Sequence, residues 1–107
     1  MQHPYDPLII RGKELLPIVQ GGMGVGISAS SLSSAMARQG AVGTIASIDL
    51  RHLHPDLLEE SNKDAHKDKH TRLNLIALDR EIKKALELSQ GNGMIAVNVM
   101  TAATDSE

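Results

Sequence analysis

The sequence contains no cysteine, no phenylalanine and no tryptophan, and Tyr5 is its single aromatic residue. Without cysteine, the chain cannot be a disulfide scaffold or a cysteine-ligated zinc module. With only one aromatic side chain, it cannot offer a stacking platform for single-stranded nucleic acid. Its core must therefore be aliphatic, and at 107 residues the chain has the length of one small domain.

An excess of one charge is also lacking, because 11 Lys and Arg residues oppose 13 Asp and Glu residues, for a net charge of −2. This balance gives no electrostatic footprint for nucleic acid or for an anionic membrane. No apolar run approaches the roughly 20 residues that a membrane-spanning helix needs, and the first residues lack a signal-peptide pattern. With cysteine absent as well, we expect a cytoplasmic protein that has neither nucleic acid nor a membrane as its partner.

The order of the predicted elements is that of an α/β fold. Apolar residues at 8–10 and 15–16 flank a turn at Gly12, which predicts a short hairpin. Three further apolar runs predict buried strands, at residues 17–20, 41–46 and 94–100. Because helices separate these strands, we expect them to pair in parallel through right-handed crossovers.

Two helices are predicted between those strands. Hydroxyl groups at residues 28–31 could cap the first helix, which ends at Gly40. Asn74 could cap the start of the second, and one apolar stripe runs along it: Leu75, Leu78, Ile82, Ala85 and Leu86. Residues 51–73 lie before it, with dense alternating charge and no apolar period, which predicts an exposed, mobile excursion.

A glycine-rich segment, residues 20–26, lies between the first predicted parallel strand and the first helix. Four glycines in seven residues would let the backbone approach a ligand closely, because no Cβ atom stands in the way. A flexible turn is the alternative, which glycine by itself does not exclude. Four glycines cost more chain entropy than a turn requires, so the composition favours a ligand site.

The same segment also fits a Rossmann-type dinucleotide-binding module. Residues 24–29 match the pattern G-x-G-x-x-G/A, and Asp49 follows the next predicted strand, where it would hold a ribose hydroxyl. Against this alternative, residues 21–23 separate the fingerprint from the end of the strand. The helix pattern also starts only after a further run of serines.

Asn98 is a polar residue within the last predicted strand. Alternation places it on the same face as Ala96 and Met100, and a buried amide there would need hydrogen-bond partners. A structural amide that bonds neighbouring backbone is one interpretation. A ligand site is the other, because parallel α/β folds bind ligands at the carboxyl ends of their strands, where the glycine-rich segment also emerges.

The histidines form two pairs, His52 with His54 and His66 with His70. The second pair has the i,i+4 spacing of two metal ligands on a helix, but it lacks the glutamate of H-E-x-x-H and lies in the charged excursion. We therefore interpret both pairs as solvated and expect no metal site. The serine run has no positioned base, so no catalytic nucleophile is predicted either.

Three segments together resemble a known family. They are PIVQGGMG at residues 17–24, GAVGTI at 40–45 and VNVM at 97–100. They are similar to the N-terminal part of the nitronate monooxygenase family, also called 2-nitropropane dioxygenase-like, whose members are FMN-dependent TIM barrels. The resemblance runs from about Leu8 to Met100 and implies that Gly22, Met23 and Gly24 border the flavin. It further implies that Asn98 hydrogen-bonds the flavin, with Gln20 as an additional cofactor-binding candidate.

The activity that this resemblance implies is oxidation of an alkyl nitronate, a small-molecule substrate, with release of nitrite and a carbonyl compound. The P-I-x-Q-G-x-M-G signature is shared in looser form with flavin-dependent enoyl-acyl-carrier-protein reductases, which is one alternative. A Rossmann-type module and a non-enzymatic, self-associating fragment are the others.

The resemblance also predicts how much of the barrel this chain can form. A TIM barrel takes about 250 residues and eight strands, so we expect residues 1–107 to form a single N-terminal segment, the first βα units of an incomplete TIM (β/α)8 barrel. In the family, the catalytic histidine and the phosphate site come from later strands. The resemblance therefore assigns no catalytic role to any histidine here and implies a segment inactive alone. Open sheet edges in such a segment would invite self-association.

Overall fold

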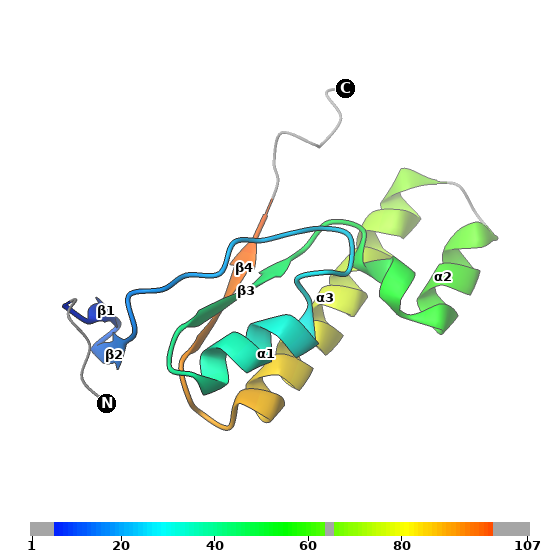
Figure 1. The fold of residues 1–107 in the computed structure, drawn as a ribbon. Coiled ribbons are helices and arrows are strands. Elements are labelled where there is room, and N and C mark those ends of the chain that lie inside the picture. Colours follow the sequence, from blue (N-terminus) through cyan, green and yellow to red (C-terminus); the bar gives the residue numbers. More distant parts are fainter. Residues whose placement is uncertain (1–5, 64–65, 100–107) are drawn as a thin grey trace.

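A computed structural model describes residues 6–63 and 66–99 of the chain, which form an α/β fold. Its elements follow one another from the N-terminus to the C-terminus (Figure 1): β1 (Leu8–Ile10), β2 (Lys13–Leu15), α1 (Ser30–Arg38), β3 (Val42–Ala46), a short 3₁₀ helix (Leu50–Leu53), α2 (Pro55–Asn62), α3 (Lys67–Ser89) and β4 (Met94–Asn98). Met100, which the sequence assigns to the last strand, lies outside the described residues, as do residues 64 and 65 of the expected excursion.

The predicted hairpin is present. β1 pairs antiparallel with β2, and the turn between them places Arg11 and Gly12 at φ values of 53° and 79°. Glycine adopts this left-handed conformation without strain, which explains its place in the turn. Figure 1 shows the hairpin set apart from the other sheet, at the N-terminal end of the chain.

The prediction of a three-stranded parallel sheet, and with it of the first βα units of a TIM barrel, is wrong. Besides the hairpin, the described residues form a parallel sheet of two strands, in which β3 pairs with β4 from Val42–Met94 to Ala46–Asn98. Residues 17–20 run alongside β3, but they form a single parallel bridge, between Val19 and Val42, rather than a strand.

The side chain of Gln20 explains why the third ladder stops. The backbone bonds Gln20 N to Val42 O, at 3.0 Å, and Val42 N to Ile18 O, at 3.1 Å, begin a parallel ladder. The next donor along β3, Thr44 N, bonds instead to the side-chain Oε1 of Gln20, at 2.9 Å. The amide side chain thus takes the place of a backbone acceptor, and the chain leaves the sheet at Gly21.

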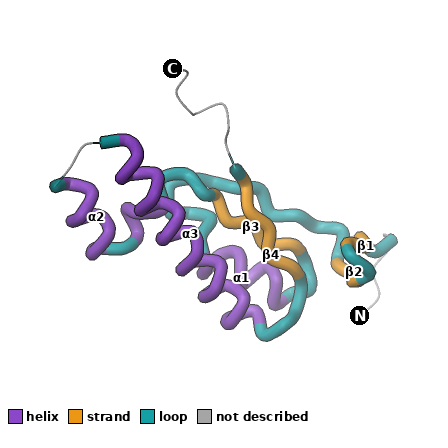
Figure 2. Tube along the Cα trace, turned by 180° about the vertical axis from the view of Figure 1, so that it is seen from behind, coloured by secondary structure: helices purple, strands orange, loops and turns teal. Residues whose placement is uncertain are grey.

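Helices α1 and α3 pack against each other on the same side of the β3–β4 sheet (Figure 2). The sheet meets α1 at Gly43, where a Cβ atom would collide with the backbone of Ser33. The core lies between sheet and helices and is aliphatic, as predicted; its buried members are Ile45, Leu50, Leu57, Leu73, Ala77 and Ala85.

Helix α3 differs from its prediction in its start and in its buried face. It begins at Lys67, seven residues before Asn74, because the charged first turns continue helically into the buried Leu73. Its buried residues recur every four positions: Leu73, Ala77, Glu81, Ala85 and Ser89. Of the stripe expected to face the core, Leu75 and Leu86 are 61% and 55% exposed. The small alanines turn inward because α1 packs closely there, and the larger leucines flank that contact.

Within the expected excursion at 51–73, the structure places the end of the 3₁₀ helix, all of α2 and the first turns of α3. Pro55 starts α2, where a missing N–H costs nothing, and Leu57 enters the core. Two 3.0 Å hydrogen bonds from Arg80 to Asp56 tie α2 to α3, and they hold the pKa of the Asp56 carboxyl below its ordinary value. No helix in the described ranges is long and apolar enough to span a bilayer.

Candidate functional site

The glycine loop, residues 21–28, connects the segment alongside β3 to the start of α1, and two side chains hold it together. Gln20 Nε2 donates to Gly21 O at 2.6 Å and to Ser28 Oγ at 2.9 Å. The Ser28 hydroxyl in turn accepts a bond from Met23 N at 2.8 Å and is fully buried. Since Oε1 of Gln20 is bonded to Thr44, the whole Gln20 amide serves to shape the loop.

Three of the loop's four glycines are explained by contacts with the chain itself. A Cβ atom on Gly22 would lie 3.0 Å from Cβ of Asn98, and one on Gly26 would lie 2.7 Å from Cδ2 of Leu53. A Cβ atom on Gly24 would collide with Ile48, whereas one on Gly21 would meet open space. These three glycines therefore let the loop lie close against its neighbours. Packing within the chain is enough to explain them, without a bound ligand.

Asn98 lies directly beneath this loop, at the carboxyl end of β4. It is paired in register with Ala46 of β3, and both residues lie within 3.6 Å of the position that a Gly22 Cβ would take. The Asn98 side chain is exposed, and it has no hydrogen-bond partner in the described parts of the chain. The structure thus brings Gly22 and Asn98 together and leaves the amide free to bond a ligand.

The sheet face that carries this contact is the one turned away from the helices. Gly43 and its register partner Ile95 face the helices. Ala46 and Asn98 lie three positions further along their strands, an odd number, so they point to the opposite side. Met23 adds an exposed apolar side chain to the same loop, at 47% exposure. The loop thus offers bare backbone beside the Asn98 amide, and it carries exposed apolar side chains, Met23 among them.

The N-terminus of α1, a position that often binds phosphate, already holds a carboxylate of the chain. Ser30 N donates to Oε1 of the buried Glu81 at 2.9 Å, and Nε2 of His54 lies 2.9 Å from the other carboxylate oxygen. Burial opposes ionisation of Glu81, but the hydrogen bonds from Ser30 and the nearby His54 outweigh it. The pKa of Glu81 is therefore below its ordinary value.

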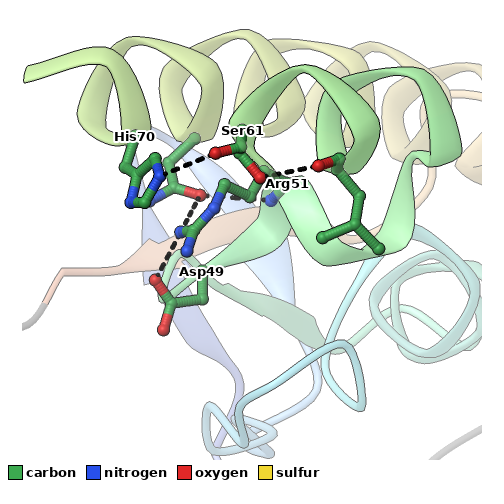
Figure 3. Close-up of polar contacts among 6 residues, drawn as sticks. Asp49, Arg51, Ser61 and His70 are labelled. Atoms are coloured by element: carbon green, nitrogen blue, oxygen red, sulfur yellow. Dashed lines mark hydrogen bonds and ion pairs between the residues drawn. The ribbon is translucent and has the colours of Figure 1, made fainter. Parts of the chain in front are cut away.

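Asp49, the residue of the dinucleotide hypothesis, is bound to Arg51. Arg51 Nη1 lies 2.9 Å from Oδ1 of Asp49, and Figure 3 shows these two residues side by side. The same nitrogen lies 3.3 Å from Oδ1 of Asn74. The backbone N of Arg51 donates to the same Asn74 oxygen at 3.2 Å. Asn74 therefore links α3 to the 3₁₀ helix instead of capping a helix start as predicted. Nearby, the His70 ring contacts Ser61 O at 3.2 Å.

The remaining polar candidates do not converge on a metal centre. Within residues 6–63 and 66–99, no three His, Asp or Glu side chains gather as a group that could hold a metal ion. His54 pairs with Glu81 and His70 with Ser61, so these two histidines serve contacts between helices. The serine run is used locally, since Ser33 Oγ donates to Ala29 O at 2.7 Å within α1.

Sequence reasoning missed two residues that shape this region, Ser28 and Glu81. Ser28 stands in a run of serines, and nothing in the sequence sets it apart from its neighbours. Glu81 could have been noticed as a charged residue at the centre of the four-residue repeat Leu73, Ala77, Ala85, Ser89. A charge at such a position indicates a specific buried partner.

No family model, no curated protein and no solved structure matches the chain. The contact between the glycine loop and Asn98 is therefore interpreted from its geometry and from the motifs of the sequence.

Proposed function

We propose that the glycine loop and Asn98 bind the isoalloxazine ring of FMN. The chain would then serve a flavin-dependent oxidoreductase of the nitronate monooxygenase kind, acting on alkyl nitronates in the cytoplasm. The observation that carries this proposal is the contact of Gly22 with Asn98, which combines close backbone approach with an amide that has no hydrogen-bond partner among residues 6–63 and 66–99. Two of the residues that carry the resemblance, Gly22 and Asn98, are thus in contact.

The chemistry of this surface fits the ring of a flavin. One edge of the isoalloxazine ring carries alternating hydrogen-bond acceptors and a donor, and an asparagine amide can both donate and accept. Because Gly22 has no side chain, the loop backbone lies directly against Asn98, and a ring that bonds the Asn98 amide would also lie beside that backbone. Met23 offers an apolar contact to the ring, and its 47% exposure leaves it accessible.

The candidate residues have two different roles in this proposal, which are to bind the ligand and to keep the loop in shape. Asn98 and the backbone of Gly22, Met23 and Gly24 are the groups that would bind the flavin. Gln20, whose amide is bonded to Gly21, Ser28 and Thr44, would act as a positioning residue for the loop. When bound, the flavin would supply the redox chemistry that oxidises a nitronate.

The dinucleotide alternative has less physical support. A Rossmann site places a pyrophosphate at the N-terminus of the first helix, and in this chain the carboxylate of Glu81 bonds Ser30 N there. A phosphate group would have to displace this buried carboxylate, which carries a charge of the same sign. Asp49, which would hold the ribose, is paired with Arg51. We expect no binding of NAD, and no change in that result with Asp49→Ala.

The test is a titration of FMN with the chain, followed by flavin fluorescence, on the wild type and two matched variants. Asn98→Ala removes the free amide. Asn92→Ala is the control, because Asn92 is also exposed but lies at the opposite end of β4. We expect quenching with the wild type and with Asn92→Ala, and at least a tenfold weaker affinity with Asn98→Ala, equivalent to about 1.4 kcal/mol. Absence of quenching by the wild type, or equal affinity of both variants, would overturn the proposal.

A further inference from the structure

The outer edge of β4 carries unpaired backbone groups. At the two ends of the β3–β4 ladder, Met94 N donates to Ala41 O and Ser47 N donates to Asn98 O, both at 3.1 Å. In a parallel ladder the residues that bond a given neighbour alternate, so Met94, Ala96 and Asn98 turn their N–H and C=O groups toward β3. Those of Ile95 and Val97 point away from β3, and within the described ranges no hydrogen bond reaches them.

The other edge of the sheet is covered. Residues 18–20 bond to Val42 through their backbone, and the Gln20 side chain bonds to Thr44 N. A partner strand can therefore add to this sheet at β4 but not at β3. In this two-stranded sheet β4 pairs with β3 on one side, so its other side is the free edge.

An uncharged apolar surface borders the free edge. Val97 and Val99 are 37% and 66% exposed, and Ile95 packs, part-exposed, with Leu78 and Ile82 of α3. The same stripe of α3 continues to Leu75 and Leu86, which are also exposed. Asp79 and Lys83 flank the stripe, and they neutralise each other through a 2.9 Å ion pair. Edge strands of stable monomers usually carry charge or proline to prevent pairing, and residues 94–99 have neither.

We propose that this edge pairs with the β4 edge of a second copy of the chain. The two strands would lie antiparallel across a two-fold axis at Val97, with Ile95 of one copy opposite Val99 of the other. In this register the outward N–H and C=O groups of residues 95, 97 and 99 of one copy face those of residues 99, 97 and 95 of the other. This is the pairing that an antiparallel ladder requires. The β3–β4 sheets of the two copies become one four-stranded sheet, and the exposed valines cover one another.

A second copy fits this edge better than a charged partner does. The edge offers main-chain bonds to an extended strand, and its side chains are uncharged, so the matching strand should be uncharged and apolar as well. Residues 94–99 of another copy meet both conditions. A two-fold contact uses the same surface on both copies, and since the β3 edge is covered, association stops at the dimer.

The test measures the mass of the full chain in solution by size-exclusion chromatography with light scattering. We expect twice the chain mass of 11.5 kDa for the wild type. Val97→Pro removes an N–H that points away from β3, which an edge strand tolerates, and should give the monomer mass. Val97→Thr is the matched control, because it keeps that N–H and the β-branched shape, and it should remain dimeric.

Amide hydrogen exchange on the wild type keeps the proposal testable if Val97→Pro fails to fold. In a dimer the Val97 amide should be protected nearly as well as the Ala96 amide, which bonds to β3, and this protection should fall on dilution. A wild type of monomer mass, an unprotected Val97 amide at high concentration, or a dimer that survives Val97→Pro in a folded state would overturn the proposal. Growth into open-ended aggregates would overturn the closed two-fold arrangement.

Discussion

The two faces of the β3–β4 sheet use glycine in different ways. On the face toward the helices, a Cβ atom on Gly43 would collide with the backbone of Ser33 in α1. On the opposite face, a Cβ atom on Gly22 would meet only the Asn98 and Ala46 side chains. Relief of the Gly43 contact requires the backbone of α1 to move, whereas at Gly22 the nearest atom, Cβ of Asn98, has to give by only a few tenths of an ångström. The contacts on the helix face are therefore tight, and those on the opposite face tolerate a small shift.

The largest difference between the faces should appear when each glycine is given a side chain. Gly43→Ala should cost about 3 kcal/mol or more, because α1 must move away from the sheet to relieve the overpacking. Urea unfolding followed by circular dichroism measures this loss as a lower midpoint. Gly21→Ala is the control, since Gly21 has open space around it and should change stability by less than about 0.5 kcal/mol. Equal stabilities of the two variants would contradict the close contact of β3 with α1.

Glu81 provides the next largest effect on the helix face. Glu81→Ala leaves Ser30 N without its acceptor and removes the carboxylate beside His54, which should cost about 2–3 kcal/mol. Glu81→Gln retains an oxygen acceptor for Ser30 N and should cost less than the alanine variant. Thermal or urea unfolding of the three proteins gives the comparison. The same loss in both variants would show that the acceptor oxygen does not matter to α1.

The ionisation of Glu81 should make the free energy of unfolding depend on pH, with a smaller effect that favours the folded chain at neutral pH. Its pKa in the folded chain lies below the unfolded value of about 4.3, so the ionised carboxylate stabilises the fold. This contribution should be complete at pH values above the unfolded pKa and should disappear as the pH falls through the folded pKa. Urea unfolding between neutral and acidic pH should show the wild type losing more stability than Glu81→Gln. Parallel curves for the two proteins would contradict this linkage.

Local patterns in the sequence were enough to predict the hairpin, the parallel strands β3 and β4, and the existence of α1 and α3. They could not predict that residues 17–20 stop short of a strand, because that depends on where the Gln20 side chain lies. Its amide takes Thr44 N, a donor 24 residues away, from the backbone ladder. Alternation and apolar content predict only whether a segment pairs through its backbone. They do not reveal a side chain that takes a backbone donor away from that pairing.

The buried face of α3 was missed for a related reason. Periodicity gave weight to the large apolar residues Leu75 and Leu86, but the closest helix contact selects small residues, Ala77 and Ala85. At the site, the motif residues Gly22 and Asn98 were recognised from the sequence. Glu81 was not, because its partner Ser30 lies 51 residues away along the chain and only the fold brings them together.

The smallest expected effect on stability lies on the loop face, at Gly22. Gly22→Ala places a Cβ atom 3.0 Å from Cβ and 3.2 Å from Cγ of Asn98, so that side chain must shift by a few tenths of an ångström. Asn98 is the last residue of β4, where the chain can make a shift of this size, so the free energy of unfolding should fall by less than about 1 kcal/mol. The FMN affinity should fall roughly fivefold to tenfold, because the amide is displaced and the bare backbone is covered. Fluorescence titration beside Gly21→Ala, which should bind as the wild type does, separates this local effect from a general change in the loop. If instead Gly22→Ala were as destabilising as Gly43→Ala, the two faces would be equally rigid, and the distinction between them would fail.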